Sequence, residues 1–270
     1  MVLRPDQFLQ TREHLTTIGH WRMQDGAAGT QATGINSEVH NDRMASIYAT
    51  SGLTFSAEVP LSHVMDPVAG TTTPNTGSVR IGSGNQYFRI DTDTLLHEPS
   101  GDFTIEAFVK VDPATVLYQS MIGKQRAGGW TWLLDVRGNA DRLALRADTQ
   151  DSPNPGDGQF NQCLTSNLNG LIKDGQWHHI AATFDDATDL FQLFVDYELV
   201  GQMTLANGGE LFYDGSPLQI GGNFIGNLDE VRLSGALLTP DEFLRAVPEP
   251  ATLALLGLGG LALLRRRKQA

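Results

Sequence analysis

Carboxylates are the most abundant ionisable side chains in this sequence, and their spacing decides what chemistry they can do. The 31 Asp and Glu residues outnumber the 19 Lys and Arg residues, which gives a formal net charge of −12. Glycoside hydrolysis needs two carboxyl groups that flank the scissile bond. Glu106 is followed by Ala107 and Phe108, and Asp229-Glu230 has no third acid beside it. The acids therefore indicate no catalytic pair.

Other catalytic patterns are also missing. His178 and His179 are adjacent in a predicted strand, so they point to opposite faces and cannot bind one metal ion together. The sequence contains no G-x-S-x-G, H-E-x-x-H, P-loop or Rossmann fingerprint. Cys163 is the only cysteine, which excludes an intrachain disulfide. The acidic balance disfavours nucleic acid as a partner. We therefore expect a non-catalytic protein.

The elements that must position these side chains are predicted to be strands. Apolar and polar residues alternate at 103–111, 130–137, 142–147 and 176–184, and clusters of Gly, Asn, Asp and Pro separate these segments. Short polar turns between such strands predict an all-β, antiparallel β-sandwich. Thr239 followed by Pro240 predicts one short helix over 240–246. Residues 65–77 are predicted to form a long exposed loop.

Several segments carry a family resemblance. Six segments of the sequence carry it. They are residues 20–25, residues 103–110, QWHHIAATFD at 176–185, LFVD at 193–196, QIGG at 219–222 and GNLDEVRL at 226–233. In this order they resemble the laminin G-like, or concanavalin A-like, jelly roll, across about residues 18–246. The resemblance implies a jelly-roll β-sandwich that binds carbohydrate or another envelope component. The alternative is a polysaccharide-active hydrolase or lyase, but the E-x-D-x-x-E run of the glucanases on this fold is absent. Tyr197 stands where the family usually has glycine, so we expect a different turn or a slightly longer loop.

Calcium, in a structural role, is the best candidate for a cofactor. Asp229 alternates with Val231 and Leu233, which predicts a carboxylate on the apolar face of a late strand. A buried carboxylate needs a cation or several hydrogen-bond donors. The first and last strands commonly lie side by side in jelly rolls of this family, which would bring Asp25 near Asp229. Hydrogen bonding of Asp229 to a neighbouring turn, without a metal, is the other interpretation.

Aromatic residues on a sheet face are the candidates for contact with a sugar ring. Trp177 and Phe108 are the two ligand-binding candidates, whereas Trp130 and Trp132 share a face with Leu134 and Val136 and are expected in the core.

The C-terminal residues form a separate tail. The motif Pro248-Glu249-Pro250 precedes an apolar run at 251–264, and Arg265, Arg266, Arg267 and Lys268 follow. The run would span about 21 Å as a helix, less than a bilayer core of about 30 Å. This arrangement resembles the PEP-CTERM sorting signal, which implies processing by an exosortase-type enzyme, a short hydrophobic transmembrane helix at the inner membrane, and release or attachment at the cell surface. A short ordinary membrane anchor is the other interpretation.

Three regions follow from these patterns: an N-terminal segment at 1–17, the jelly-roll domain at 18–246 and the sorting tail at 247–270. An exported protein should begin with a signal peptide, and the opening residues have no apolar core of the required length. We expect the true start to lie upstream.

The tail is predicted to be removed after export. Intact-mass measurement of the protein from its native host should show a species without the basic cluster. A mature species that still contains residues 265–268 would contradict this prediction.

Calcium is predicted to stabilise the domain through Asp229. A ligand that binds only the folded state adds about 2.7 kcal/mol when it is a hundredfold above its Kd, so excess calcium should raise the Tm by several degrees. Asp229→Asn should abolish most of that shift. Identical melting curves with calcium and with a chelator would mean that the site does not exist.

Overall fold

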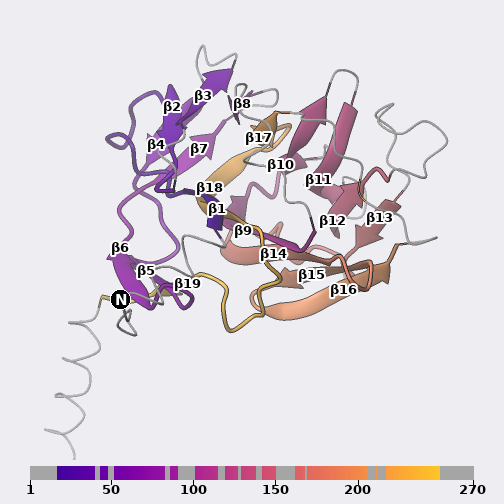
Figure 1. The fold of residues 1–270 in the computed structure, drawn as a ribbon. Helices are drawn as coiled ribbons and strands as arrows, with labels where there is room; N and C mark the ends of the chain where they lie inside the picture. The colour runs from indigo at the N-terminus through magenta and orange to yellow at the C-terminus, as the bar shows by residue number, and fades with distance from the viewer. Residues whose placement is uncertain are drawn as a thin grey trace, which may run out of the picture.

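Two antiparallel sheets form the body of the molecule (Figure 1). The computed structural model describes residues 17–39, 43–47, 52–82, 86–90, 101–114, 119–126, 129–137, 142–149, 162–167, 169–205, 211 and 217–249. These residues form nineteen strands and no helix. The prediction of an all-β, antiparallel sandwich is confirmed.

Sheet A has the order β16-β15-β14-β9-β18-β7-β4, and β1 pairs with β18 beside β7. Its strands are β1 (Thr17–Trp21), β4 (Leu53–Ser56), β7 (Ser78–Ile81), β9 (Phe103–Val111), β14 (Trp177–Asp185), β15 (Leu190–Val195), β16 (Glu198–Thr204) and β18 (Gly226–Ser234).

Sheet B has the order β13-β12-β11-β10-β17-β8-β3-β2. Its strands are β2 (Gly34–Asn36), β3 (Arg43–Ile47), β8 (Gln86–Ile90), β10 (Gln119–Arg126), β11 (Gly129–Arg137), β12 (Arg142–Ala147), β13 (Gln162–Thr165) and β17 (Leu218–Gly222). Sheet C is smaller and contains β5 (His63–Asp66), β6 (Thr71–Pro74) and β19 (Arg245–Val247) in the order β19-β5-β6.

The main core lies between sheets A and B. All five apolar residues of the predicted alternation in β9 are buried there, from Phe103 to Val111. They meet residues of sheet B such as Trp132, whose ring stacks on Phe103 at 5.9 Å. Sheet B also supplies Leu134 and Leu145 to this core. Each sheet thus contributes one face, as the alternation requires.

A β-bulge in β18 changes the face on which its residues lie. Asp229 pairs with Phe108 and Arg232 pairs with Glu106, so three residues of β18 advance against two of β9. Glu230 within the bulge has a positive φ of 48°. The prediction that Asp229 shares a face with Val231 and Leu233 is therefore wrong. Those two residues are in the core, whereas Asp229 lies with Phe108 on the outer face of sheet A.

Sheet C covers part of this outer face. Val64 of β5 and Leu244 pack with Phe108, and Phe243 packs with Phe194 and Ala181. The predicted loop at 65–77 is wrong, since it contains the end of β5 and the whole of β6. The predicted helix at 240–246 is also wrong. Thr239 and Glu242 bond to each other as a helix cap would, but only a turn forms before the chain extends into β19 to pair with β5.

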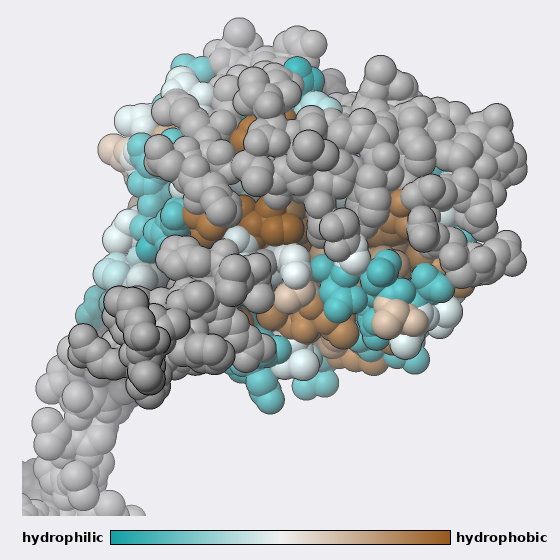
Figure 2. Space-filling view, in the orientation of Figure 1, coloured by the Kyte–Doolittle hydropathy of each residue, from teal (hydrophilic) through white to brown (hydrophobic). Residues whose placement is uncertain are grey.

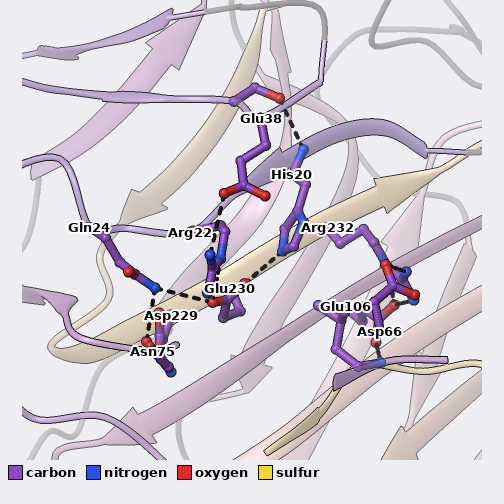
Figure 3. A network of polar contacts seen from close by, with 12 residues as sticks. His20, Arg22, Gln24, Glu38, Asp66, Asn75, Glu106, Asp229, Glu230 and Arg232 are labelled. Atoms are coloured by element: carbon purple, nitrogen blue, oxygen red, sulfur yellow. Dashed lines mark hydrogen bonds and ion pairs between the residues drawn. The ribbon is translucent and has the colours of Figure 1, made fainter. Parts of the chain in front are cut away.

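A buried ion network holds this outer layer in place (Figure 3). The Arg232 guanidinium donates to Glu106 at 2.7 Å and to Asp66 of β5 at 2.9 Å, and also to the Glu242 carbonyl. The second oxygen of Glu106 accepts from His179 and from the Leu244 amide, each at 2.8 Å. Burial alone would raise the pKa of Glu106, but Arg232 and these hydrogen bonds lower it to about 2.

The β15–β16 connection differs from our expectation. Val195 pairs with Glu198, so the turn has only two residues, Asp196 and Tyr197, with φ values of 48° and 72°. This is a two-residue hairpin turn with positive φ at both positions. Contacts with His179 of β14 and with Leu244 of the outer layer compensate for the strain at Tyr197. Its ring stacks on His179 at 4.7 Å, and its hydroxyl donates to the Leu244 carbonyl at 3.1 Å.

Residues 1–16 and 250–270 lie outside the described residues, and with them the predicted hydrophobic helix and most of the sorting tail. Among the residues that are described, none belongs to a helix long and apolar enough to cross a membrane.

Replacement of Arg232 by Met should destabilise the domain by about 3–5 kcal/mol, because Glu106 and Asp66 would keep buried charges without a cation.

In the wild type, the free energy of unfolding should fall as the pH drops from about 4.5 toward 2, because the pKa of Glu106 is lowered in the folded state. Urea unfolding at several pH values measures both effects.

Arg142→Met is the matched control, since Arg142 makes a single exposed side-chain hydrogen bond to Asn169. Equal stability of the Arg232 and Arg142 variants would contradict the role given to the network.

Candidate functional site

An open pocket lies on the outer face of sheet A, where sheet C does not cover it. Its volume is about 280 Å³, and its lining consists of Glu58, Arg80, Lys110, Val111, Asp112, Pro113, Gly175 and Asn227. Asn227 pairs with Lys110 on one side and with Arg80 on the other, so three adjacent strands place these side chains in a row. Gly226 permits the close approach of these strands, because a Cβ there would lie 2.3 Å from the Lys110 carbonyl oxygen.

The pocket combines two cations with two carboxylates. Lys110 Nζ donates to Glu58 at 2.6 Å. Arg80 donates to Asp112 and to the Asn227 side-chain oxygen, both at 3.4 Å. The Arg80 contacts are long for charge-assisted hydrogen bonds, which are usually about 2.7–2.9 Å. Its partly exposed guanidinium therefore holds these partners weakly.

Trp177 does not line the pocket itself but stands next to one of its residues. It pairs directly with Lys110, and residues opposite each other on antiparallel strands have neighbouring side chains. Its half-buried ring packs against the cluster of Val64, Phe108 and Leu244. Phe108 itself is buried, with 3% of its surface exposed, because Val64 and Leu244 cover it. The expectation that Phe108 offers an exposed ring is therefore wrong.

A second polar cluster surrounds the bulge in β18 (Figure 3). His20 and Arg22 both contact Glu230, at 2.7 and 2.9 Å. Asp229 accepts from Asn75 at 2.7 Å, and its other oxygen is buried without a partner. Burial and the neighbouring charge of Glu230 raise the pKa of Asp229 well above its ordinary value. The cluster thus joins β1 and the residue that follows it to β18.

The two predicted calcium ligands are placed differently. β1 does pair with β18, the late strand that contains Asp229, as we expected. Asp25, however, accepts hydrogen bonds from the backbone and side-chain amides of Asn36. Nowhere in the described ranges do three or more His, Cys, Asp or Glu side chains gather as metal ligands. Calcium needs six or more oxygen ligands, and the side chains around Asp229, which include the cation Arg22, do not supply them. Asp229 instead accepts a hydrogen bond from Asn75, which agrees with the interpretation without a metal. The melting experiment remains the test.

His178 and His179 point to opposite faces, as predicted. His178 bonds Asp196 at 2.8 Å and Asp174 at 3.0 Å, and these contacts raise its pKa. His179 belongs to the buried network with Glu106.

Another buried carboxylate lies in sheet B. Asp135 of β11 is paired with Arg146 of β12. Burial raises the pKa of Asp135 to about 6 despite the charges of Arg146 and Arg137. Sequence patterns did not single out this pair.

Most residues of the pocket were also missed. Lys110 is the last residue on the face of β9 opposite the core, and this position in the alternation is the one sequence signal that predicts an outward-facing side chain there. Glu58, Arg80 and Asp112 come from three distant parts of the chain, and nothing in their spacing brings them together.

Solved structures share this fold. Domain 4 of AbnA, an extracellular arabinanase of Geobacillus stearothermophilus in complex with arabinotriose, has a TM-score of 0.58 at 15% identity, over 84% of this chain and 95% of that domain. The binding domain of Paraclostridial Mosquitocidal Protein 1 has a TM-score of 0.51 at 14% identity, over 85% of this chain and 51% of that one. A structure of botulinum neurotoxin type C, described as dependent on two ganglioside molecules for cell entry, has a TM-score of 0.51 at 7% identity, with coverages of 86% and 50%.

The chain therefore spans about half the length of the toxin domains and nearly all of the arabinanase domain. At these identities the likeness concerns the fold. No curated protein sequence matches the chain.

Two family models match consecutive parts of the sequence. The PEP-CTERM protein-sorting motif matches residues 246–268, which confirms the resemblance of the tail and indicates an exported protein sorted to the cell surface. The other model covers residues 82–243, more than half of the chain, and by this match the protein belongs to the concanavalin A-like lectin/glucanases superfamily.

Proposed function

We propose that this protein is a non-catalytic, carbohydrate-binding module of the cell surface. The observation that carries the proposal is the open polar pocket of Arg80, Lys110, Glu58, Asp112 and Asn227 beside the half-buried ring of Trp177.

The side chains of the pocket suit a ligand rich in hydroxyl groups. Carboxylates accept hydrogen bonds from hydroxyls, cations donate to them, and the amide of an asparagine can do both. Trp177 adds an aromatic surface at the edge, which matches the apolar face of a sugar ring. A volume of about 280 Å³ is just below the usual range of about 300–1,000 Å³ for ligand pockets, so it suits one or two sugar units.

The charge of the pocket favours neutral sugars over phosphorylated ligands. Lys110 and Arg80 are balanced by Glu58 and Asp112. A phosphate would have to displace both carboxylates and would meet an acidic protein surface. The coloured part of the surface in Figure 2 shows hydrophilic and hydrophobic residues side by side, with brown areas near the middle of the view and teal residues mostly toward its edges.

The buried acids support a non-catalytic role. Glu106 and Asp66 are both buried and paired with Arg232, and the two carboxylates of the pocket, Glu58 and Asp112, are paired with Lys110 and Arg80. A general acid or nucleophile must instead face the glycosidic bond.

The sorting tail supplies the location. We infer that the apolar run at 251–264 enters the inner membrane and that an exosortase-type enzyme removes the tail. The domain is then released or attached at the cell surface, where polysaccharide is the expected partner.

Binding to a panel of polysaccharides, with arabino-oligosaccharides included, tests this function. Arg80→Ala and Lys110→Ala should each weaken binding about tenfold or more, because a hydrogen bond to a charged group contributes about 1.5–3 kcal/mol. Isothermal titration with the purified chain measures the Kd, and an assay of new reducing ends should detect no hydrolysis.

Arg142→Ala is the control, because Arg142 lies in β12 of sheet B, away from the pocket, and its side chain bonds Asn169. The function fails if no glycan binds, or if the Arg80 and Arg142 variants bind equally well. The appearance of reducing ends would favour the hydrolase alternative.

A further inference from the structure

The sorting motif begins where the last strand of the fold ends. Val247 of β19 pairs with His63 of β5, and His63 pairs in turn with Pro74 of β6. Pro248 and Glu249 follow directly and are exposed. The folded domain therefore holds the chain up to the first residue of the motif, without an intervening linker.

This arrangement makes the tether to the apolar run very short. Four steps separate Val247 from Ala251, and a fully extended chain spans at most about 3.6 Å per residue, which gives about 14 Å. The polar region on each side of a bilayer is about 5–7 Å thick. When the run at 251–264 lies in the membrane, the end of sheet C that contains Val247 must stay at the membrane surface.

The tether cannot be extended into the residues before β19 without the loss of buried contacts. The residues just before it are fixed by the buried network, in which the Leu244 amide donates to Glu106 and Arg232 donates to the Glu242 carbonyl. Release of this segment would leave the Glu106 carboxylate with fewer donors in a buried site.

The same end of sheet C presents apolar residues. The bend Val59-Pro60-Leu61 precedes β5, and Leu61 is 41% exposed, one of three large apolar side chains so exposed in the described part of the chain. The Ser62 carbonyl accepts from the Asn75 amide, which places this bend beside the end of β6 and its exposed Pro74.

We propose that this end of sheet C, formed by Leu61, Pro74 and Val247-Pro248, is the membrane-contacting surface of the domain while the tail is intact, and that Leu61 enters the headgroup region. The proposal rests on the membrane insertion of the tail proposed above. The partner is the lipid bilayer, and the tether rather than charge keeps the surface against it.

The full chain in vesicles of phosphatidylethanolamine and phosphatidylglycerol tests the proposal. In a Cys163→Ser background, Leu61→Cys carries an environment-sensitive fluorophore, and headgroup-labelled lipid carries a quencher. Ala187→Cys is the matched control. Ala187 is exposed in the turn that follows β14. It lies about 30 Å along that strand from Trp177, and Trp177 packs beneath sheet C. Quenching should be at least threefold stronger at position 61 than at position 187.

A second variant carries twelve Gly and Ser residues between Val247 and Pro248. The longer tether should reduce quenching at position 61 to the level at position 187. Equal quenching at the two positions without the insertion would overturn the proposal, as would unchanged quenching at position 61 with the insertion. A full chain that does not float with the vesicles would overturn both the orientation and the membrane step. A chain that floats and binds glycan but shows equal quenching would reject the orientation alone.

Discussion

A carboxylate buried on the outer face of a sheet is the constraint on which the rest of this structure depends. Glu106 is completely buried, and an uncompensated charge there would cost several kcal/mol. The bulge in β18 compensates for this charge, because it places the cation Arg232 directly opposite Glu106. The remaining donors and acceptors of the pair are then satisfied only by β5, by His179 and by the segment before β19. Sheet C, the third layer, is thus needed to complete the hydrogen bonds of the buried ion pair.

The outer layer divides the surface of sheet A into two parts. Phe108 and His179 lie beneath it, in contact with Leu244 and Tyr197. Arg80, Lys110 and Asn227 lie beyond its edge and form the pocket. Trp177 stands at the boundary, half covered by the layer and next to Lys110. The position of the proposed binding site and the point from which the tail leaves are therefore both consequences of how sheet C packs.

Strand alternation predicted the sandwich well, because burial of one face imposes a period of two on every strand. The five apolar residues of β9 lie in the main core as the alternation predicted, but the opposite face of this strand, expected to be exposed, is mostly buried as well. The segments that carry the family resemblance coincide with β14, β15 and β18. The pattern failed where an extra residue breaks the period. Nothing in the letters of 226–233 marks the bulge at Glu230, and so Asp229 was assigned to the wrong face.

Local signals also failed where tertiary contacts outweighed them. The hydrogen bonds of the predicted helix cap at Thr239 do form. The residues that follow are nevertheless extended, because the Leu244 amide donates to the Glu106 carboxylate and β19 pairs with β5. The positive φ at Tyr197 is tolerated because its ring and hydroxyl are held by His179 and Leu244. The pocket could not be predicted, since its charged residues come from separate segments that only the sheet order joins.

Hydrogen exchange at the Leu244 amide tests the central claim most directly. This amide is donated to a buried carboxylate, so it should exchange as slowly as the amides of β9 and β14 in the main core. In Glu106→Ala its exchange should accelerate by at least a hundredfold, while the core amides of β14 change much less. A Leu244 amide that exchanges in the wild type as fast as that of the exposed turn residue Ala187 would contradict the account.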